Sequence, residues 1–136
     1  MGNSEKPTYV FEEPYAKFDR DGVTIFEGFY SGPDKHGEKA MILYSVKKKA
    51  HVNEETPHIH DFPIILNFLS ANPDDIYDFD AEIEFHIGGE KHIITKTSSV
   101  RIPAGTVHCP LIFKRIGKPV VFLEVHLTDE YTRREP

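Results

Sequence analysis

Short runs of β-branched and aromatic residues, separated at close intervals by turn residues, dominate this sequence. The clearest runs cover residues 40–46, 64–69, 81–87 and 120–127. Gly88-Gly89 separates one of these runs from the next, 92–95, which is the spacing of a two-residue β-hairpin. No stretch carries a convincing helical stripe. The pattern predicts an all-β chain of eight or nine short strands, folded as an antiparallel barrel or sandwich.

Length and composition fit one domain with a single core. The chain has 136 residues, of which 39% are apolar, and a chain of this size can bury a substantial interior. The first twenty residues are rich in proline, charged and aromatic residues. They predict an irregular arm, residues 1–20, with a short strand around residues 9–11. We expect the barrel to cover residues 21–128 and a C-terminal tail to follow at 129–136.

The acidic balance of the chain argues against polyanionic partners. The formal net charge is −6 at pH 7, so neither nucleic acid nor an anionic membrane surface is an expected partner. No apolar run approaches the ~20 residues that a membrane-spanning helix needs. The single cysteine, Cys109, leaves no internal disulfide. A cytoplasmic protein is therefore expected.

Two histidines stand two residues apart in the stretch TPHIHDFPIILNFL, residues 56–69. On an extended strand, side chains two apart leave the same face, so His58 and His60 share a face. The same phase continues with Phe62, Ile64, Leu66 and Phe68. The opposite phase, which includes Asp61 and Asn67, is more polar. We therefore expect the first face to point inward and both imidazoles to lie at the mouth of the barrel.

A third histidine follows a proline and glycine turn, in the stretch IPAGTVHC. Pro103 and Gly105 form the turn, and His108 comes three residues after the glycine, at the predicted start of the next strand. Cys109 follows directly, so its side chain is expected on the opposite face of that strand. We interpret it as a buried structural thiol, because no cation is placed to make it reactive.

Together the two clusters resemble the sequence motifs of the cupin superfamily. His58-X-His60 matches the centre of the first motif, and Pro103-X-Gly105-X-X-His108 matches the centre of the second. The resemblance covers most of the chain. It implies a small β-barrel of jelly-roll topology, commonly a homodimer. In such barrels a divalent metal is held by the two histidines of the first motif, a glutamate four residues further on, and the histidine of the second motif.

The glutamate position of the first motif is occupied here by Ile64. The three other positions, His58, His60 and His108, still predict a metal site, because imidazole is a common ligand of divalent transition metals. Zn, Fe, Mn, Ni, Cu and Co all remain open as the ion. Three neutral imidazoles leave both positive charges of the ion uncompensated, which favours a small anionic molecule as ligand.

Four further polar residues are candidates to replace the missing glutamate. They are Glu82, Glu84, Glu124 and His126. On both strands these residues alternate with apolar ones, and this alternation favours a polar stripe that faces solvent. Solvent exposure is therefore the preferred interpretation for all four, and replacement of the glutamate is the alternative.

The sequence is compatible with three classes of function. The first is a metal-dependent enzyme of oxygenase, lyase or isomerase type that acts on a small organic anion. The second is a non-catalytic binding or sensor protein, in which the apolar inner face selects a metabolite. The third is a structural cupin domain that works through its dimer interface. Stoichiometric metal would support the first two, and stable metal-free protein would support the third.

Overall fold

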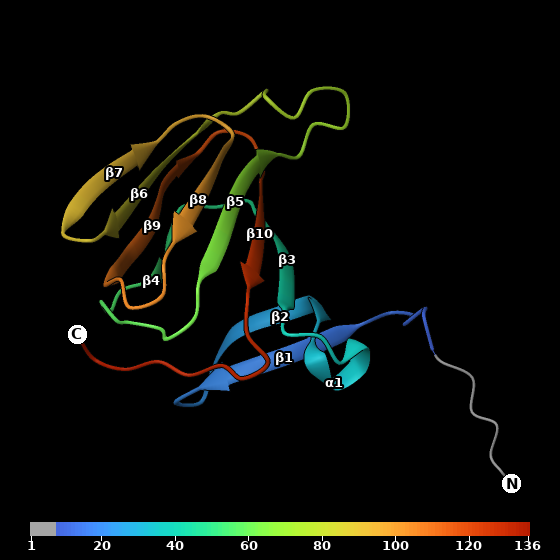
Figure 1. The fold of residues 1–136 in the computed structure, drawn as a ribbon. Coiled ribbons are helices and arrows are strands. Elements are labelled where there is room, and N and C mark those ends of the chain that lie inside the picture. The colour runs from blue at the N-terminus through green and yellow to red at the C-terminus, as the bar shows by residue number, and fades with distance from the viewer. Residues whose placement is uncertain (1–7) are drawn as a thin grey trace, which may run out of the picture.

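Two antiparallel β-sheets packed face to face form the protein in this computed structural model, which describes residues 8–136 (Figure 1). This part of the chain contains ten strands and one short helix. Their bounds are β1 Tyr15–Arg20, β2 Val23–Ser31, α1 Pro33–His36, β3 Met41–Lys47, β4 His51–Glu54, β5 Ile64–Ser70, β6 Ala81–Ile87, β7 Glu90–Ile94, β8 Ser98–Ile102, β9 His108–Ile116 and β10 Val120–His126. Within residues 8–136, no helix has the length and hydrophobicity needed to cross a membrane.

The chain passes repeatedly between the two sheets. The larger sheet has the strand order β1-β2-β3-β10-β5-β8, and the smaller sheet has the order β4-β9-β6-β7. Neighbours such as β10 and β5, or β6 and β9, pair antiparallel. Because β5 and β6 are consecutive yet lie in different sheets, each sheet depends on the other for its core. The predicted all-β, antiparallel architecture is confirmed.

The N-terminal strand differs from the prediction in position. Residues 9–11 form no strand, and the first strand is β1, which pairs with β2. β2 in turn pairs with β3 through only three residue pairs, from Phe29 with Tyr44 to Ser31 with Ile42. The β1–β2 hairpin therefore extends past the body of the larger sheet, as the blue strands in Figure 1 show. The limits of arm, barrel and tail stay predictions.

The core lies between the sheets and is rich in phenylalanine. Phe68, Phe85, Phe113 and Phe122 are at most 2% exposed, and each such side chain contributes about 1.5–3 kcal/mol when removed from water. The rings of Phe68 and Phe122 stack with their centroids 5.1 Å apart. Phe62, which precedes β5 in the phase of Ile64, is buried, and so are Leu66 and Phe68, which follow in that phase on the strand. The inward phase predicted for this strand is therefore confirmed.

The hairpin between β6 and β7 also has the predicted form. Gly88 and Gly89 are its two turn residues, with φ values of 58° and 83°. A turn in which both residues have positive φ matches the right-handed twist of the flanking strands and favours glycine.

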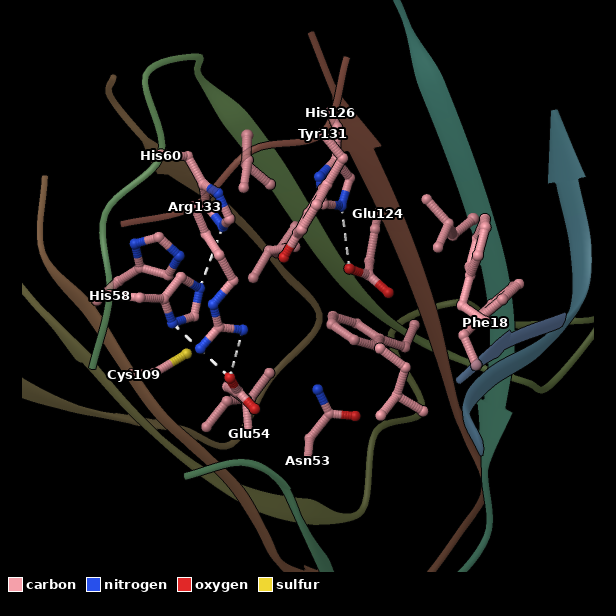
Figure 2. Close-up of a pocket in the computed structure, with 18 of the residues that line it drawn as sticks. Phe18, Asn53, Glu54, His58, His60, Cys109, Glu124, His126, Tyr131 and Arg133 are labelled. Carbon is pink, nitrogen blue, oxygen red and sulfur yellow. Dashed lines mark hydrogen bonds and ion pairs between the residues drawn. The ribbon is translucent and has the colours of Figure 1, made fainter. Parts of the chain in front are cut away.

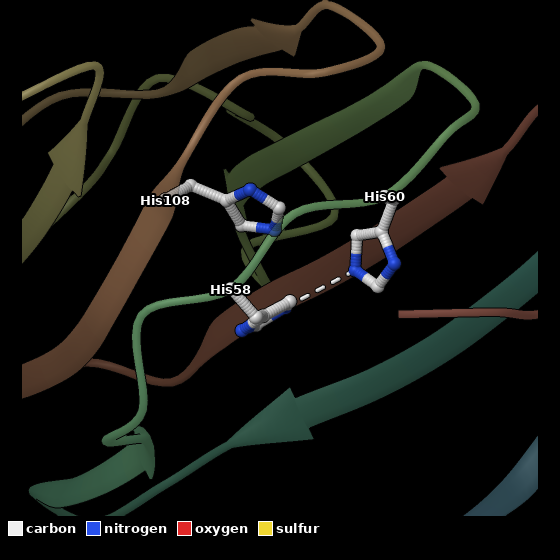
Figure 3. A group of neighbouring side chains, drawn as sticks. All are labelled: His58, His60 and His108. Carbon is white, nitrogen blue, oxygen red and sulfur yellow. Dashed lines mark hydrogen bonds between the residues drawn. The ribbon is translucent and has the colours of Figure 1, made fainter. Parts of the chain in front are cut away.

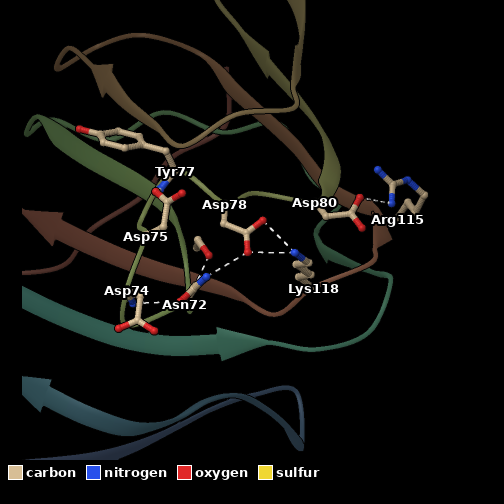
Figure 4. A network of polar contacts seen from close by, with 9 residues as sticks. Asn72, Asp74, Asp75, Tyr77, Asp78, Asp80, Arg115 and Lys118 are labelled. Atoms are coloured by element: carbon tan, nitrogen blue, oxygen red, sulfur yellow. Dashed lines mark hydrogen bonds and ion pairs between the residues drawn. The ribbon is translucent and has the colours of Figure 1, made fainter.

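An acidic connection, residues 72–80, joins β5 to β6 at one end of the sandwich (Figure 4). Lys118 binds both carboxylate oxygens of Asp78, at 2.8 and 2.9 Å, and Arg115 binds Asp80 at 2.7 Å. The amide of Asn72 also donates to Asp78, at 3.0 Å. These contacts hold the longest loop of the described chain against the turn before β10.

Candidate metal centre

A cavity of about 480 Å³ opens between the two sheets (Figure 2). Core side chains form its apolar floor, among them Ile64, Leu66, Phe85 and Phe122. Its polar side chains include three histidines, which lie near the opposite end of β5 from the acidic connection. A cavity of this size with a few convergent polar groups is typical of a small-molecule site.

Backbone contacts bring the two histidine clusters together. His58 and His108 form an isolated antiparallel bridge, in which each backbone N–H donates to the other residue's carbonyl at 3.1 Å. The N–H of Gly105 donates to the carbonyl of His60 at 2.8 Å. Gly105 has φ of +80°, a conformation that favours glycine. The turn before β9 is therefore fastened to the strand-like stretch before β5.

The three imidazole rings converge on one point (Figure 3). One ligand atom from each of His58, His60 and His108 lies within 4.8 Å of the others. The three side chains are almost completely buried, with relative exposures of 5%, 3% and 4%. The predicted convergence of these rings inside the sandwich is confirmed, and such a cluster is consistent with metal binding.

Hydrogen bonds at Nδ1 define the protonation of each ring. His58 Nδ1 lies 2.7 Å from the Thr56 carbonyl, His60 Nδ1 lies 2.6 Å from the Thr132 carbonyl, and His108 Nδ1 lies 3.0 Å from the Thr106 carbonyl. A carbonyl oxygen accepts only, so each Nδ1 must carry the hydrogen. In a neutral ring the other nitrogen, Nε2, is then a bare lone pair, which is the form that binds a metal.

Burial keeps these rings neutral. It lowers the pKa of His58 and of His60 from 6.5 to about 4 in each case. Burial also lowers the pKa of His108. Near neutral pH the three rings therefore carry no proton at Nε2.

The contact between His58 and His60 needs a cation. Their Nε2 atoms lie 3.1 Å apart, and with both Nδ1 atoms protonated these are two acceptors facing each other. Two lone pairs at hydrogen-bond distance repel unless a positive charge lies beside them. The donor set therefore fits a metal ion, which would be bound by both nitrogens and by the third ring.

Two residues of β10 lie on the inner face, contrary to the sequence interpretation. His126 is 6% exposed, and both it and Glu124 line the cavity. His126 Nε2 lies 3.2 Å from Glu124 Oε1. The expectation of a solvent-facing stripe was wrong, because the alternating apolar residues Val120 and Phe122 share the inward phase with them.

Cys109 also differs from its predicted orientation. Its side chain lines the same cavity as His108 instead of leaving the opposite face. Cys109 has φ of +82°, and the pairing of β6 with β9 shifts register here, which turns both side chains to one side. The thiol is buried, as predicted, and burial raises its pKa to about 12. It is thus a neutral thiol.

Four cavity residues carry chemistry that the sequence patterns did not identify. They are Arg20, Glu54, Tyr131 and Arg133. Glu54 ends β4, and its Oε1 lies 2.7 Å from Arg133 Nη1 and 3.4 Å from Arg20 Nη1. The Tyr131 ring lies 5.1 Å from the His60 ring, centroid to centroid. None of the four residues belongs to a run of alternating apolar and polar residues from which its orientation could be predicted. Their charged or polar character is the only signal that the sequence gives for them.

Comparison with known proteins finds similarity in structure only. No protein-family model matches the chain, and no curated protein matches it. The polyketide cyclase RemF from Streptomyces resistomycificus has a TM-score of 0.59 and 13% identity, over 96% of this chain and 85% of that one. A predicted oxalate decarboxylase from Thermotoga maritima has a TM-score of 0.56 and 16% identity, over 86% of this chain and 94% of that one. A mutant of the Bacillus subtilis oxalate decarboxylase OxdC has a TM-score of 0.54 and 10% identity, over 80% of this chain and 27% of that one.

The TM-scores of these three structures, 0.54 to 0.59, show a shared fold. The chain has a cupin fold. The cupin jelly roll predicted from the two histidine motifs is therefore confirmed. At such low identities the similarity shows the fold alone, and any chemistry depends on the residues of this chain.

The glutamate of the first cupin motif has no replacement at its own position. Ile64 is 3% exposed and belongs to the apolar floor. Glu84, one of the candidate replacements, instead binds His86 at 2.8 Å and lies within 3.5 Å of Lys91 and Lys114 on the outer face. The solvent-facing phase predicted for the Glu82 and Glu84 strand is confirmed. Within residues 8–136, the cluster that could hold an ion therefore consists of three histidines.

Proposed function

We propose that this cupin binds a divalent metal ion through His58, His60 and His108, and that it acts on a small organic anion held in the adjoining cavity. The observation that carries the proposal is the convergence of three bare Nε2 atoms, two of them 3.1 Å apart, at buried rings whose Nδ1 atoms donate to backbone carbonyls. Such a donor set is arranged for a cation.

The donor types limit the ion without naming it. Neutral imidazole suits Zn, Fe, Mn, Co, Ni and Cu, and an all-nitrogen set disfavours Ca and Mg. Mn(II) centres are described in the oxalate decarboxylase of Bacillus subtilis, which supports keeping manganese among the candidates. When bound, the ion would supply a Lewis acid that polarises an oxygen of the ligand.

The residues around the histidines support an enzyme more than a passive binder. His126 and Glu124 form a hydrogen-bonded pair on the cavity wall, and such a pair is able to hold or move a proton beside a bound ligand. The apolar floor excludes water from the ligand's body. The alternative is a non-catalytic binding protein. The apolar floor of the cavity favours it, because an apolar surface alone is enough to select a metabolite.

A homodimer and a cytoplasmic location are part of the same proposal. The β1–β2 hairpin exposes apolar side chains that a second subunit would cover. They are Tyr15, Val23, Ile25 and Phe29, each 43–63% exposed. Several exposed apolar side chains on one hairpin support association.

Metal content tests the proposal directly. Purified protein should contain about one transition-metal ion per chain, and the double variant His58→Ala/His60→Ala should contain none, because it lacks two of the three nitrogens. The matched control is His86→Ala/His92→Ala, which removes two histidines of the outer surface and should keep the metal. Equal metal content in the two double variants would refute the proposal.

A further inference from the structure

One corner of the cavity carries an excess of positive charge. Glu54 Oε1 is shared by two guanidinium groups, Arg133 at 2.7 Å and Arg20 at 3.4 Å. One carboxylate cannot neutralise two guanidinium groups. A guanidinium also has five N–H groups, and Glu54 and the Tyr131 hydroxyl occupy only part of those of Arg133. Arg133 therefore retains both charge and hydrogen-bonding capacity.

Arg133 lies beside the histidine cluster. The Glu54 oxygen that it binds also lies 3.8 Å from His58 Nδ1. Figure 2 shows the Arg133 side chain between His58, His60 and Glu54. The positive charge of Arg133 contributes to the lowered pKa of both His58 and His108. Arg133 and the histidines thus face the same part of the cavity.

The chain holds Arg133 in this place by its backbone. The next residue, Arg134, pairs with Ile59 through two backbone hydrogen bonds of 2.9 Å, and its side chain lies 3.2 Å from Asp61. The preceding residue, Thr132, accepts the hydrogen bond from His60 Nδ1. The residues on both sides of Arg133 are therefore held in place, and its guanidinium group is held by Glu54. A side chain that is already ordered loses little conformational entropy when it binds a ligand.

The charges of the whole cavity indicate what such a ligand carries. Three cationic and three anionic side chains line the cavity: Arg20, Lys47, Arg133, Asp19, Glu54 and Glu124. These charges cancel, so the two positive charges of a bound divalent ion would have no counterpart among them. The cavity floor, by contrast, is apolar. The matching ligand has an anionic head and an apolar body.

We propose that Arg133 is the specificity-determining residue of this site, and that it binds the carboxylate of an apolar carboxylic acid whose body lies on the floor around Leu66 and Phe122. This assignment rests on the proposed function, because the histidine cluster marks where the ligand's head lies. A planar guanidinium binds a carboxylate through two parallel hydrogen bonds, which a neutral amide of the same shape cannot accept in the same way.

Calorimetric titration with phenylacetate tests the assignment, and phenylacetamide serves as its neutral isostere. Both are titrated into zinc-loaded and metal-free protein. The Arg133→Gln variant should bind phenylacetate about tenfold more weakly or worse, which is the loss expected for one charge-assisted hydrogen bond. Its binding of phenylacetamide should be unchanged. Arg133→Lys, which keeps the charge without the fork, should give an intermediate loss.

Arg20→Gln is the matched control. It removes one positive charge from the same cavity and from the same Glu54 oxygen, but this arginine pairs at 3.4 Å instead of 2.7 Å and its side chain is more exposed, 37% against 25%. Its affinity for phenylacetate should stay within about twofold of the unmodified protein if the effect of Arg133 is a direct contact, because a more exposed charge that does not touch the ligand is partly screened. Thermal unfolding of each variant verifies that the fold is kept.

The outcomes separate this inference from the proposed function. Loss of phenylacetate affinity in Arg133→Gln alone, in either the zinc-loaded or the metal-free form, supports it. Equal losses in Arg133→Gln and Arg20→Gln, no loss in either, or no phenylacetate binding by the unmodified protein would overturn it. Failure of the protein to bind zinc or any other transition metal would instead refute the proposed function.

Discussion

The two ends of β5 handle buried or crowded polar groups in opposite ways. At the acidic connection, hydrogen bonds from Lys118 and Asn72 lower the pKa of Asp78, so the charged form is favoured. At the histidine end, burial lowers the pKa of His58 and His60, so the neutral form is favoured. At the acidic end, partners from the chain stabilise a charged side chain, whereas at the histidine end the side chains are neutral.

The two polar clusters differ in whether the protein supplies all the partners that their polar atoms need. Asp78 and Asp80 are joined to Lys118 and Arg115 (Figure 4), and the protein itself supplies what these groups need. The Nε2 atoms of His58 and His60 lie 3.1 Å apart, and neither carries a hydrogen when both Nδ1 atoms donate to backbone carbonyls. The carboxylates at the acidic end have all the hydrogen-bond and ion-pair partners that they require. The unprotonated histidine nitrogens have lone pairs without such a partner, and a bound cation would supply one.

The largest expected effect is on the pH dependence of stability of the metal-free protein. The pKa of His58 and His60 is about 4 in the folded protein, whereas an unperturbed histidine, as in the unfolded chain, has a pKa of 6.5. As the pH falls from 6.5 to 4, the unfolded state binds protons that the folded state does not, so stability must fall with pH. Two rings correspond to about 3 kcal/mol for each pH unit in this window.

Urea unfolding at pH 7, 6, 5 and 4.5 measures this dependence. The curve should become much less steep in His58→Ala/His60→Ala, which keeps only His108 of the three rings, and should stay steep in Asp78→Asn. The pKa of Asp78 lies below its ordinary 3.8, so the stability that this carboxylate contributes is present above that pH and is lost only as the pH falls further. A flat curve between pH 6.5 and 4.5 would contradict the neutral, buried state of the rings.

The next effect is the response to added cations. Zn²⁺ at a hundred times its dissociation constant should stabilise the folded protein by about 2.7 kcal/mol, or raise the thermal midpoint by about 10 °C for a chain of this length. Ca²⁺ at the same concentration should have no effect, because Asp78 and Asp80 are already paired. Differential scanning fluorimetry measures both. An equal shift with Ca²⁺ would mean that the acidic end is an open ion site.

The smallest effect is expected when the acidic end is opened. Lys118→Ala removes an ion pair that is exposed to solvent, and the midpoint of urea unfolding should decrease by at most about 0.3 M. The difference should vanish in 1 M NaCl, since exposed pairs are screened by salt. A decrease that persists at high salt would mean that Lys118 stabilises the loop by packing rather than by charge.

The sequence predicts the histidine centre well because strand periodicity decides it. His58 and His60 continue the inward phase of β5, and the turn at Gly105 places His108 at the start of β9. Both inferences need only the two-residue repeat of a strand and the chemistry of a turn. The three histidines that the sequence predicts to converge are therefore the three that lie together in the structure.

The same periodicity fails on β10 because both phases of that strand are largely apolar. Val121, Leu123 and Val125 alternate as regularly as Val120 and Phe122, so alternation cannot say which phase faces the core. β10 lies between β3 and β5, inside the larger sheet. Polar residues on such a strand mark a cavity, and only the fold shows that Glu124 and His126 line it.

The positions of Arg133 and Glu54 in the cavity could not be predicted, for a different reason. Arg133 follows the last strand, in a stretch with no hydrophobic repeat, and its position depends on the pairing of its neighbour Arg134 with Ile59, far away in the sequence. Glu54 lies where β4 shifts register against β9. Neither placement follows from local pattern, because both result from long-range contacts that form only in the folded chain.

The three rings are oriented by main-chain oxygens, and this has a consequence for mutagenesis. Threonine stands at all three acceptor positions, yet the hydroxyls of Thr56, Thr106 and Thr132 are not the groups that hold His58, His108 and His60. Alanine scanning would pass over these positions without a phenotype. Replacing the amide link after one of them with an ester, which makes its carbonyl a weaker acceptor, would reveal what side-chain substitution conceals.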